Sequence, residues 1–390
     1  MKRGLFGWIL FTVLAGNLLP AFSAGDNLPE VKKDTIRAGE DAEVRSFSDR
    51  MEMTIEKIFR YVPLPAGGYS TETSWYFGLV KYNTFRVRSR ILPDSLVESS
   101  KVMVAGTYSL NGQYTFSGDL DLVFGANRFT SQLKLQVKGF PSFFYGVGND
   151  TRKEDGILTD FRNFEFTPVL NYDIRNRNFI GVKLTLNNYS RVEPLDSVPD
   201  EIPYRENEGL QSGLGVRYFF DSRDDRIRTE RGLYLFTSFD LIGKYLGSDF
   251  DFHTFSLDLR GFITPWSGVT FAGQVLSRLQ GGDVPVQSLA FVGGNYMLRG
   301  YYSRRFRDKS SVAAQMEVRF PIYWIVSGVV YGGLGQVAPA CREMQWNAFH
   351  YAGGGGIRVI FDKRSRSAIR FDVSFSGEGH TFFLGFGEAF

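Results

Sequence analysis

The chain of 390 residues is rich in aromatic side chains (16%) and in glycine (43 residues), but it contains only 3 histidines and 1 cysteine. Its 45 Lys and Arg residues nearly balance 42 Asp and Glu residues, so there is no basic excess that would attract nucleic acid. The only cysteine, Cys341, cannot form an internal disulfide and is no metal site by itself.

The N-terminus has the three parts of a secretory signal peptide. Lys2 and Arg3 form a positively charged region, an apolar stretch follows at residues 5–14, and small residues lie at positions 21, 23 and 24. The apolar stretch is shorter than the roughly 20 residues that a membrane-spanning helix needs. We therefore expect residues 1–24 to be a cleaved signal peptide, with an uncleaved N-terminal membrane anchor as the alternative.

Residues 25–60 separate the signal peptide from the strands that follow. Apolar residues recur here at every fourth position: Phe47, Met51, Ile55 and Phe59. This spacing predicts an amphipathic helix from about residue 43 to residue 60. We interpret the segment as a periplasmic tether or as a helix packed on the rim of a barrel. The alternative is a plug or a docking segment for a partner protein.

From about residue 71 onward, apolar and polar side chains alternate with a period of two. Because alternate side chains of a strand face opposite sides of a sheet, each segment has one apolar and one charged face. The apolar set includes Leu133, Ile180, Leu257 and Phe371, and the polar set includes Lys134, Lys183, Asp258 and Asp372. A soluble β-sandwich would show the same alternation. These segments are longer than most soluble strands, however, and no domain break interrupts them. The pattern therefore favours a transmembrane barrel.

Residues 61–390 divide into sixteen predicted strands, an even number as single-chain bacterial barrels require. The predicted strands are 71–84, 98–110, 113–125, 128–138, 142–150, 161–173, 177–190, 209–221, 231–243, 250–264, 267–279, 311–320, 324–336, 347–361, 367–377 and 380–390. The fold class is thus all-β, a 16-stranded antiparallel transmembrane β-barrel with a short N-terminal periplasmic helix. Short turns such as 110–113 and 175–178 are expected at the periplasmic end, and long loops such as 280–310 at the outer end.

The last predicted strand ends on aromatic residues. Phe382, Leu384, Phe386 and Phe390 share one parity, so all four are expected on the apolar face. Phe386 and Phe390 are the candidates for a barrel C-terminal signal. Together with the signal peptide, they predict an integral protein of the cell outer membrane.

Three segments resemble motifs of the BamA/TamA superfamily of outer-membrane barrels, the bacterial surface-antigen family. Residues 291–301 (FVGGNYMLRGY) are similar to the family's loop-six motif, in which an Arg-Gly-aromatic tip folds back into the barrel. Residues 221–232 (DSRDDRIRTERG) resemble its Asp-rich turn, and residues 65–73 (PAGGYSTET) resemble the beginning of a first strand. The resemblance covers about residues 61–390 and implies a barrel of this family in a Gram-negative-type bacterium.

The loop-six motif consists of Leu298, Arg299, Gly300 and Tyr301. Gly300 permits the tight backbone of such a tip, and a guanidinium inside a barrel must find a carboxylate or several acceptors. Glu317, which the alternation places in the lumen, matches the family's acidic partner. The resemblance places a second acid of the family at Gly333 in this chain. The ion pairing that holds Arg299 in the lumen, which we call the lock, is therefore expected to be weaker or shared with other residues. The alternative is that Arg299 is an exposed cation like the arginines that follow it.

The resemblance also implies a function. Members of the family that insert barrels or secrete substrates carry periplasmic POTRA domains, and residues 25–60 are too few to hold one. We therefore expect a member without POTRA domains that assists outer-membrane protein insertion or translocation, embedded in the lipid bilayer and served by a separate periplasmic or outer-membrane partner. The rival interpretation is a passive channel or structural barrel with a lumen of mixed charge. No motif indicates an enzyme, a metal, a cofactor or a nucleic-acid partner.

Overall fold

The computed structural model describes residues 63–70, 74–88, 97–139, 141–194, 207–226, 228–362 and 367–390. The predicted signal peptide (1–24) and amphipathic helix (43–60) lie outside these residues. In the described part of the chain, seventeen strands join one large sheet and two short strands form a second sheet.

The strands of the large sheet are β1 (Leu64–Ser70), β2 (Ser74–Arg86), β3 (Ser99–Ser109), β4 (Tyr114–Phe124), β5 (Phe129–Gly139), β6 (Ser142–Phe144), β7 (Ile157–Arg175), β8 (Asn178–Pro194), β9 (Gly209–Asp221), β10 (Gly232–Ile242), β11 (Phe252–Trp266), β12 (Val269–Gly282), β15 (Ser310–Tyr323), β16 (Val326–Ala338), β17 (His350–Asp362), β18 (Ser367–Ser376) and β19 (Gly379–Phe386). Sixteen of them follow one another as antiparallel neighbours, and the short β6 lies beside β7. The second sheet pairs β13 (Ala290–Val292) with β14 (Phe306–Asp308).

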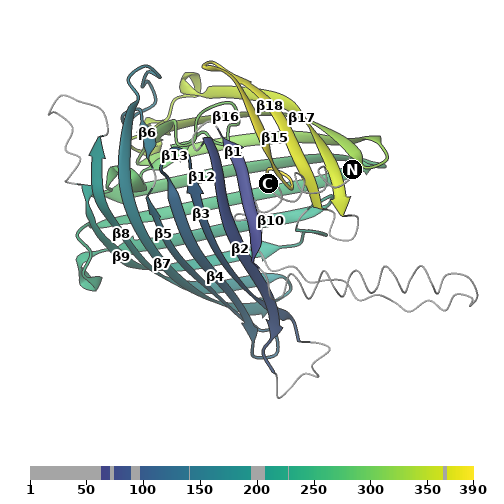
Figure 1. Cartoon of the computed structure of the whole chain (residues 1–390), viewed down its shortest axis with the longest axis horizontal. Coiled ribbons are helices and arrows are strands. Elements are labelled where there is room, and N and C mark those ends of the chain that lie inside the picture. Colours follow the sequence, from purple (N-terminus) through teal and green to yellow (C-terminus); the bar gives the residue numbers. More distant parts are fainter. Residues whose placement is uncertain are drawn as a thin grey trace, which may run out of the picture.

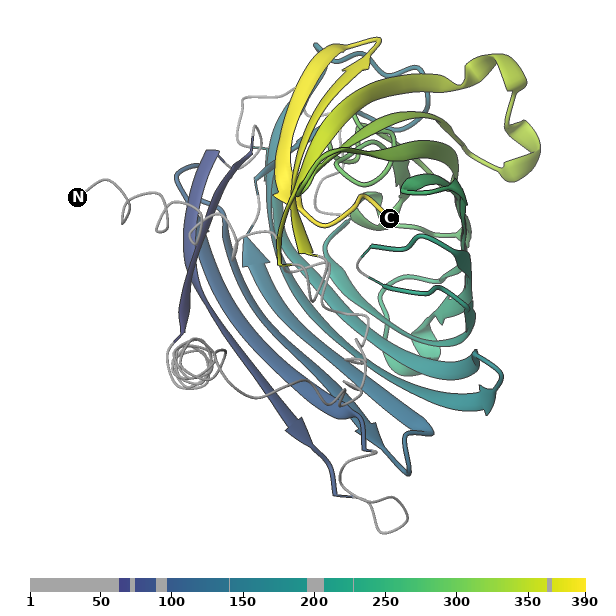
Figure 2. The same ribbon diagram turned by 90° about the vertical axis from the view of Figure 1, so that its right-hand side faces the viewer.

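The large sheet curls around an interior space. Figure 1 shows the long strands side by side, and Figure 2 shows the sheet curving round so that the purple first strands and the yellow last strands approach the same side of the molecule. Among the described strands, the registers pair β1 with β2 alone and β19 with β18 alone. The first and last strands are therefore edges of the curled sheet.

The predicted count of sixteen antiparallel neighbours is right, although one predicted strand is wrong and one observed strand was not predicted. The predicted strand 142–150 is wrong, because β6 ends at Phe144 and Gly146 and Gly148 take φ values of 92° and 113° that leave the extended conformation. The strand β1 was not predicted, because its sequence, LPAGGYS, contains a proline and two glycines and has no clear alternation. The missed strand β1 and the wrongly predicted strand 142–150 offset each other, so the total number of strands is unchanged.

Because β1 is present and the predicted strand 142–150 is wrong, the turn between β3 and β4 lies at the opposite end of the sheet from the one predicted. Counted from β1, the β3–β4 turn at residues 110–113 lies at the same end as the long connection 283–309, so its predicted periplasmic position is wrong. The β7–β8 turn at 176–177 and the β11–β12 turn at 267–268 lie at the opposite end, as predicted.

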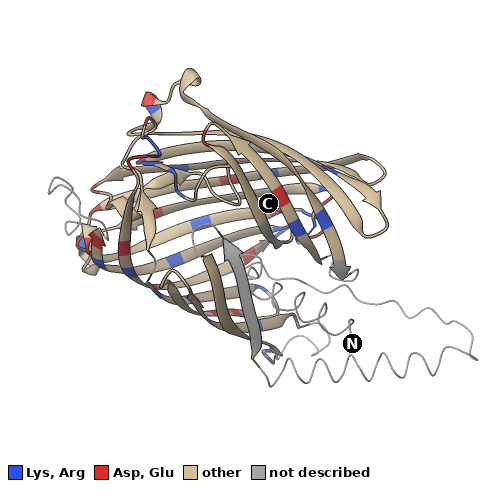
Figure 3. Cartoon of the chain, turned by 45° about the horizontal axis from the view of Figure 1, so that its top comes forward, with Lys and Arg blue, Asp and Glu red and all other residues tan. Residues whose placement is uncertain are grey.

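The two faces of the sheet have the polarity that the alternation predicts. On the inner face, Lys134 Nζ lies 2.9 Å from Glu165 and Lys183 Nζ lies 2.7 Å from Asp240. Charged residues of both signs are scattered along the strands (Figure 3). The outer face exposes large apolar side chains, among them Val182, Val216, Met316, Val330, Phe371, Phe375 and Phe382. No helix in the described part of the chain is long and apolar enough to cross a membrane.

Candidate functional site

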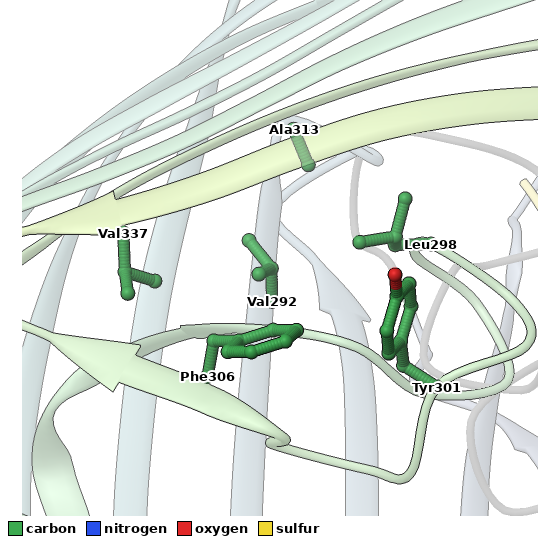
Figure 4. Close-up of a cluster of buried hydrophobic side chains, with 6 residues drawn as sticks. All are labelled: Val292, Leu298, Tyr301, Phe306, Ala313 and Val337. Carbon is green, nitrogen blue, oxygen red and sulfur yellow. The ribbon is translucent and has the colours of Figure 1, made fainter. Parts of the chain in front are cut away.

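The connection between β12 and β15, residues 283–309, folds back against the inner face of the sheet, and we call it loop six. Its strands β13 and β14 form a small hairpin-like pair, and its tip continues beyond them. Four loop side chains pack with two wall residues in one buried cluster: Val292, Leu298, Tyr301 and Phe306 with Ala313 and Val337. Figure 4 shows these loop side chains directed toward β15 and β16. The loop is therefore part of the core rather than an exposed connection.

Arg299 at the loop tip lies in a buried site between two carboxylates. Its side chain is only 3% exposed. The Nη2 group donates to Glu317 on β15, and the Nη1 group donates to Asp372 on β18 at 3.1 Å. The guanidinium carbon also lies 3.5 Å from the ring centre of Tyr331 on β16. The predicted pairing of Arg299 with Glu317 is present, and a second acid shares it.

The tip approaches the wall closely at Gly300. This residue has a φ of 120°, and a Cβ atom here would lie 3.2 Å from the Cβ of Ser376 and 3.3 Å from the backbone of Phe375. The hydroxyl of Ser376 donates to the carbonyl of Gly300 at 2.9 Å. Only glycine combines this backbone conformation with so close an approach, so Gly300 fixes the depth at which Arg299 enters the sheet.

Glycines on β17 make room for the wall residues that hold Arg299. A Cβ atom at Gly354 would lie 2.8 Å from the hydroxyl of Tyr331, and one at Gly356 would collide with the carboxylate of Asp372. Without side chains at these positions, Tyr331 of β16 and Asp372 of β18 reach across β17 toward the loop tip. The run Gly353–Gly356 is thus part of a strand, and its alternate members Gly354 and Gly356 leave a gap in the inner face.

The second carboxylate beside Arg299 does not come from position 333, where the resemblance predicts an acid. Gly333 lies on β16, where a Cβ atom would already be tight against Ala314 and Gln315. Asp372, two strands away, supplies the second carboxylate instead. The alternation placed Asp372 on the inner face, but its contact with Arg299 depends on the glycines of β17, which the sequence pattern does not reveal.

Arg299, Glu317 and Asp372 belong to a larger ring of alternating charges. From Glu317 the ring continues to Arg319 (2.8 Å), Glu388 (3.8 Å) and Arg358 (2.8 Å), and Arg358 returns to Asp372 (2.5 Å). All six side chains are at most 5% exposed. Each of the six charges has at least two partners of opposite sign, which offsets the desolvation cost of burying it.

The segment after β19 contributes to this ring, which contradicts the predicted strand 380–390. The strand ends at Phe386, and Gly387 with a φ of 68° turns the chain inward. Glu388 then pairs with Arg358, and Arg319 Nη2 donates to the backbone oxygen of Phe390 at 3.0 Å. The ring of Phe390 lies 6.2 Å from that of Phe262 inside the sheet. The predicted outward position of Phe390 is therefore wrong, because Gly387 ends the alternation. The Phe386 side chain lies outside the described ones.

The Asp-rich segment 221–232 also reaches the ring. Asp221 pairs with Arg223 at 2.9 Å and with Arg226 at 3.2 Å, and Asp224 accepts backbone N–H groups of residues 230 and 231. These contacts fold the turn that presents Arg228, whose Nε lies 3.9 Å from Glu388. The Asp-rich segment and loop six, which are distant in sequence, are thus linked through Glu388 and the ring of charges.

Arg305, which follows the tip, is not a free cation either. Arg305 is 1% exposed; its Nε donates to Glu378 at 2.6 Å, and its Nη1 and Nη2 donate to Thr151 at 2.7 Å. It joins loop six to the β6–β7 connection and to the β18–β19 turn. The alternative that Arg299 is an exposed cation is therefore excluded. Among the described residues, no group of His, Cys, Asp and Glu side chains could hold a metal ion.

Comparison with known proteins identifies relatives of this chain. Residues 105–362 match the Omp85 superfamily domain. The chain is 27% identical over 231 residues to the outer membrane protein assembly factor BamA of Nitratidesulfovibrio vulgaris strain Hildenborough. The match covers 53% of this chain but only 29% of that relative, so the chain spans less than a third of the relative's length.

Solved structures share the fold. BamA from Haemophilus ducreyi lacking POTRA domains 1–3 superposes with a TM-score of 0.57 at 11% identity, covering 82% of this chain and 68% of that one. CdiB from Escherichia coli gives a TM-score of 0.57 at 8% identity, covering 82% of this chain and 60% of the other. CdiB from Acinetobacter baumannii gives 0.51 at 10% identity, covering 82% and 57%.

Proposed function

Because the chain belongs to the Omp85 superfamily, we propose that it acts as a transmembrane β-barrel that assists the insertion or translocation of other polypeptides. It is an integral protein of the outer membrane of a Gram-negative-type bacterium. The apolar outer face of the sheet contacts lipid, and the charged inner face lines the lumen. In this proposal it moves other polypeptides into or across the membrane and is not an enzyme.

The observation that carries this proposal is the pair of edges at β1 and β19. Each has an antiparallel partner on one side only among the described strands. An unpaired strand edge presents a row of N–H and C=O groups to another strand. In a lipid bilayer such groups need partners, because water is absent. A client strand that enters the membrane can meet this need transiently.

The buried ring of charges supports the same function. It holds loop six on β15 and also anchors Glu388, two residues after the end of the last strand. The loop tip and the β19 edge are thus connected through Arg319 and Arg358. We propose that the ring of charges keeps β15–β19, the strands next to the β19 edge, in one defined arrangement.

A photo-crosslinking experiment tests the proposal. A photoreactive amino acid at Ala66 on β1 is expected to form adducts with an unfolded outer-membrane protein during its insertion into vesicles that contain this chain. The matched control is the same residue at Val330, which is exposed on the outer face of β16 but not at an edge. Client insertion that is no faster than in empty vesicles, or equal adducts at both positions, would contradict the proposal.

The rival function is a passive channel, which the mixed charges of the inner face favour. Residues of both signs line it, including Lys134, Glu165, Lys183 and Asp240. A channel would give steady conductance in planar bilayers and no client adduct at Ala66. Conductance therefore discriminates between the two functions when it is measured on the same preparation.

We also propose a separate partner that acts with residues 25–60. Deletion of residues 25–55 is then expected to leave folding and membrane insertion intact while a protein that co-purifies from native membranes is lost. If the segment plugs the lumen instead, the same deletion raises conductance. No change in either measurement would show that the segment is only a tether.

A further inference from the structure

A second group of cations lies inside the curled sheet, apart from the ring of charges. It consists of Lys138 on β5, Arg278 on β12, and Arg304 and Arg307 in loop six. Residues 138 and 278 lie near the ends of their strands from which the β5–β7 connection and loop six leave. The group therefore lies at the outer end of the lumen, beneath loop six.

Among the described residues, none of the four cations forms an ion pair with an acid. Arg304 is the charged neighbour with the largest electrostatic effect on each of the other three. Burial, and then the charge of Arg304, lower the pKa of Arg307 to about 9. The acids that also act on this group are Glu165 and Asp240, and these already form ion pairs with Lys134 and Lys183.

A small cavity lies beside two members of this group, Arg304 and Arg307. Its volume is about 30 Å³, and its wall combines Arg304 and Arg307 with polar side chains of Ser142, Thr159 and Gln287. The ammonium of Lys138 lies 5.8 Å from the ring centre of Phe161, which belongs to the same wall. Such a cavity accommodates one small polar group rather than an extended ligand.

Some donors of the cations have no acceptor. The Nε groups of Arg304 and Arg278 are buried and have no hydrogen-bond partner. Arg307 is held in place, because its Nε donates to the carbonyl of Arg304 and its Nη2 to the carbonyl of Phe143. A buried N–H group without an acceptor is costly. Of Arg304 and Arg278, only Arg304 lines the cavity, so an anion in the cavity would accept a bond from Arg304 and also balance the charge of the group.

We propose that the cavity beneath loop six binds a phosphate group between Arg304 and Arg307. The planar guanidinium fork matches the oxygens of phosphate, and hydroxyl groups such as those of Ser142 and Thr159 add neutral donors. Lys138 and Arg278, on strands of the large sheet, do not line the cavity but contribute positive charge near it. The phosphate group is either a free inorganic ion or the headgroup of a lipid, which share this chemistry.

Calorimetric titration of the full chain in neutral detergent and chloride buffer tests the site. One arm adds inorganic phosphate, and the other adds phosphatidic acid in mixed micelles, with diacylglycerol as its uncharged control. Saturable binding in either arm is expected, and Arg304→Gln should weaken it by roughly tenfold or more, since a charge-assisted hydrogen bond is lost. Arg342→Gln, at an exposed arginine of the β16–β17 connection, should leave the affinity unchanged.

The two arms also identify the source. Binding of inorganic phosphate that Arg304→Gln weakens supports a site for the free ion, and binding of phosphatidic acid alone supports a headgroup site. Arg278→Gln provides a second variant if Arg304→Gln does not fold, because the Arg278 Nε has no partner to lose. Heat-modifiability on gels checks the fold of each variant. Binding in neither arm, or binding that Arg278→Gln and Arg304→Gln leave unchanged, would overturn the proposal.

Discussion

Arg299 and Asp372 are 73 positions apart in the chain, yet the Nη1 group of the arginine donates to the aspartate at 3.1 Å inside the curled sheet. The bond joins the tip of loop six to the next-to-last strand. Glu317, on the strand that follows the loop, accepts from the same guanidinium. One side chain thus connects loop six and the strand that follows it to a strand near the end of the chain.

The first prediction concerns the Arg299–Glu317 pair. Arg299→Ala leaves two buried carboxylates with one partner fewer each, so it should lower the free energy of unfolding by about 3–5 kcal/mol. The Arg299→Ala/Glu317→Ala double variant should be no less stable than the worse single variant, so the coupling energy should be at least as large as the smaller of the two single losses. Unfolding in detergent, monitored by heat-modifiability on gels, measures the losses of stability and the coupling energy.

Lys134 provides the control for this cycle. It pairs with Glu165 on the same inner face, but its side chain is 43% exposed, so Lys134→Ala should cost about 0–1 kcal/mol. Combined with Arg299→Ala, its effect should simply add. Strictly additive losses for Arg299 and Glu317 as well would show that the loop tip is not locked to the wall.

How far the sequence predicts this site depends on the kind of contact. The Arg299–Glu317 pair could be predicted, because the alternation directs Glu317 inward and the Arg-Gly-Tyr tip resembles a known motif. The part played by Asp372 could not, since it depends on the missing side chains at Gly354 and Gly356. The inward turn of Phe390 could not be predicted either, because it follows from the positive φ of Gly387. Alternation predicts the face of a residue within a strand but not the point at which the strand ends.

The second prediction tests the gap in β17. A methyl group at Gly356 would collide with Asp372 and lie 3.0 Å from Arg358 Nη1, so Gly356→Ala should displace Asp372 from Arg299. The expected loss of stability is about 1–3 kcal/mol, as for other overpacked sites. Gly332→Ala on β16 is the matched control, since its Cβ atom would come no closer than 3.9 Å to another atom. Equal melting temperatures of the two variants would argue against the gap.

The third prediction concerns the lipid-facing side of the sheet. Met316 lies in the middle of β15 and is 65% exposed on the outer face. Met316→Arg should cost about 2–4 kcal/mol, as for a cation at the middle of a bilayer. Tyr323→Arg, at the end of the same strand and 78% exposed, should cost about 0–1 kcal/mol. Refolding into vesicles at increasing urea measures both, and equal costs would mean that this face does not contact lipid.

The last prediction concerns Glu388, which follows β19 and is the one acid in the ring outside the strands. It lies within 4 Å of Arg228, Arg319 and Arg358. Glu388→Gln keeps the shape of the side chain but leaves these buried cations with less compensation, so it should lower stability by about 3–5 kcal/mol. The weakened contact should also release residues 387–390 from the lumen.

Hydrogen–deuterium exchange reports this release directly. The amide of Gly387 donates to the carbonyl of Ala368 at 2.9 Å, and its protection should fall in Glu388→Gln before that of the β18–β19 pairs. Glu343→Gln, at an exposed acid of the β16–β17 connection, should leave the exchange unchanged. If Gly387 stays protected in Glu388→Gln, the packing of Phe390 against Phe262 is sufficient to hold the segment, and the ion pairs are not what turns it inward.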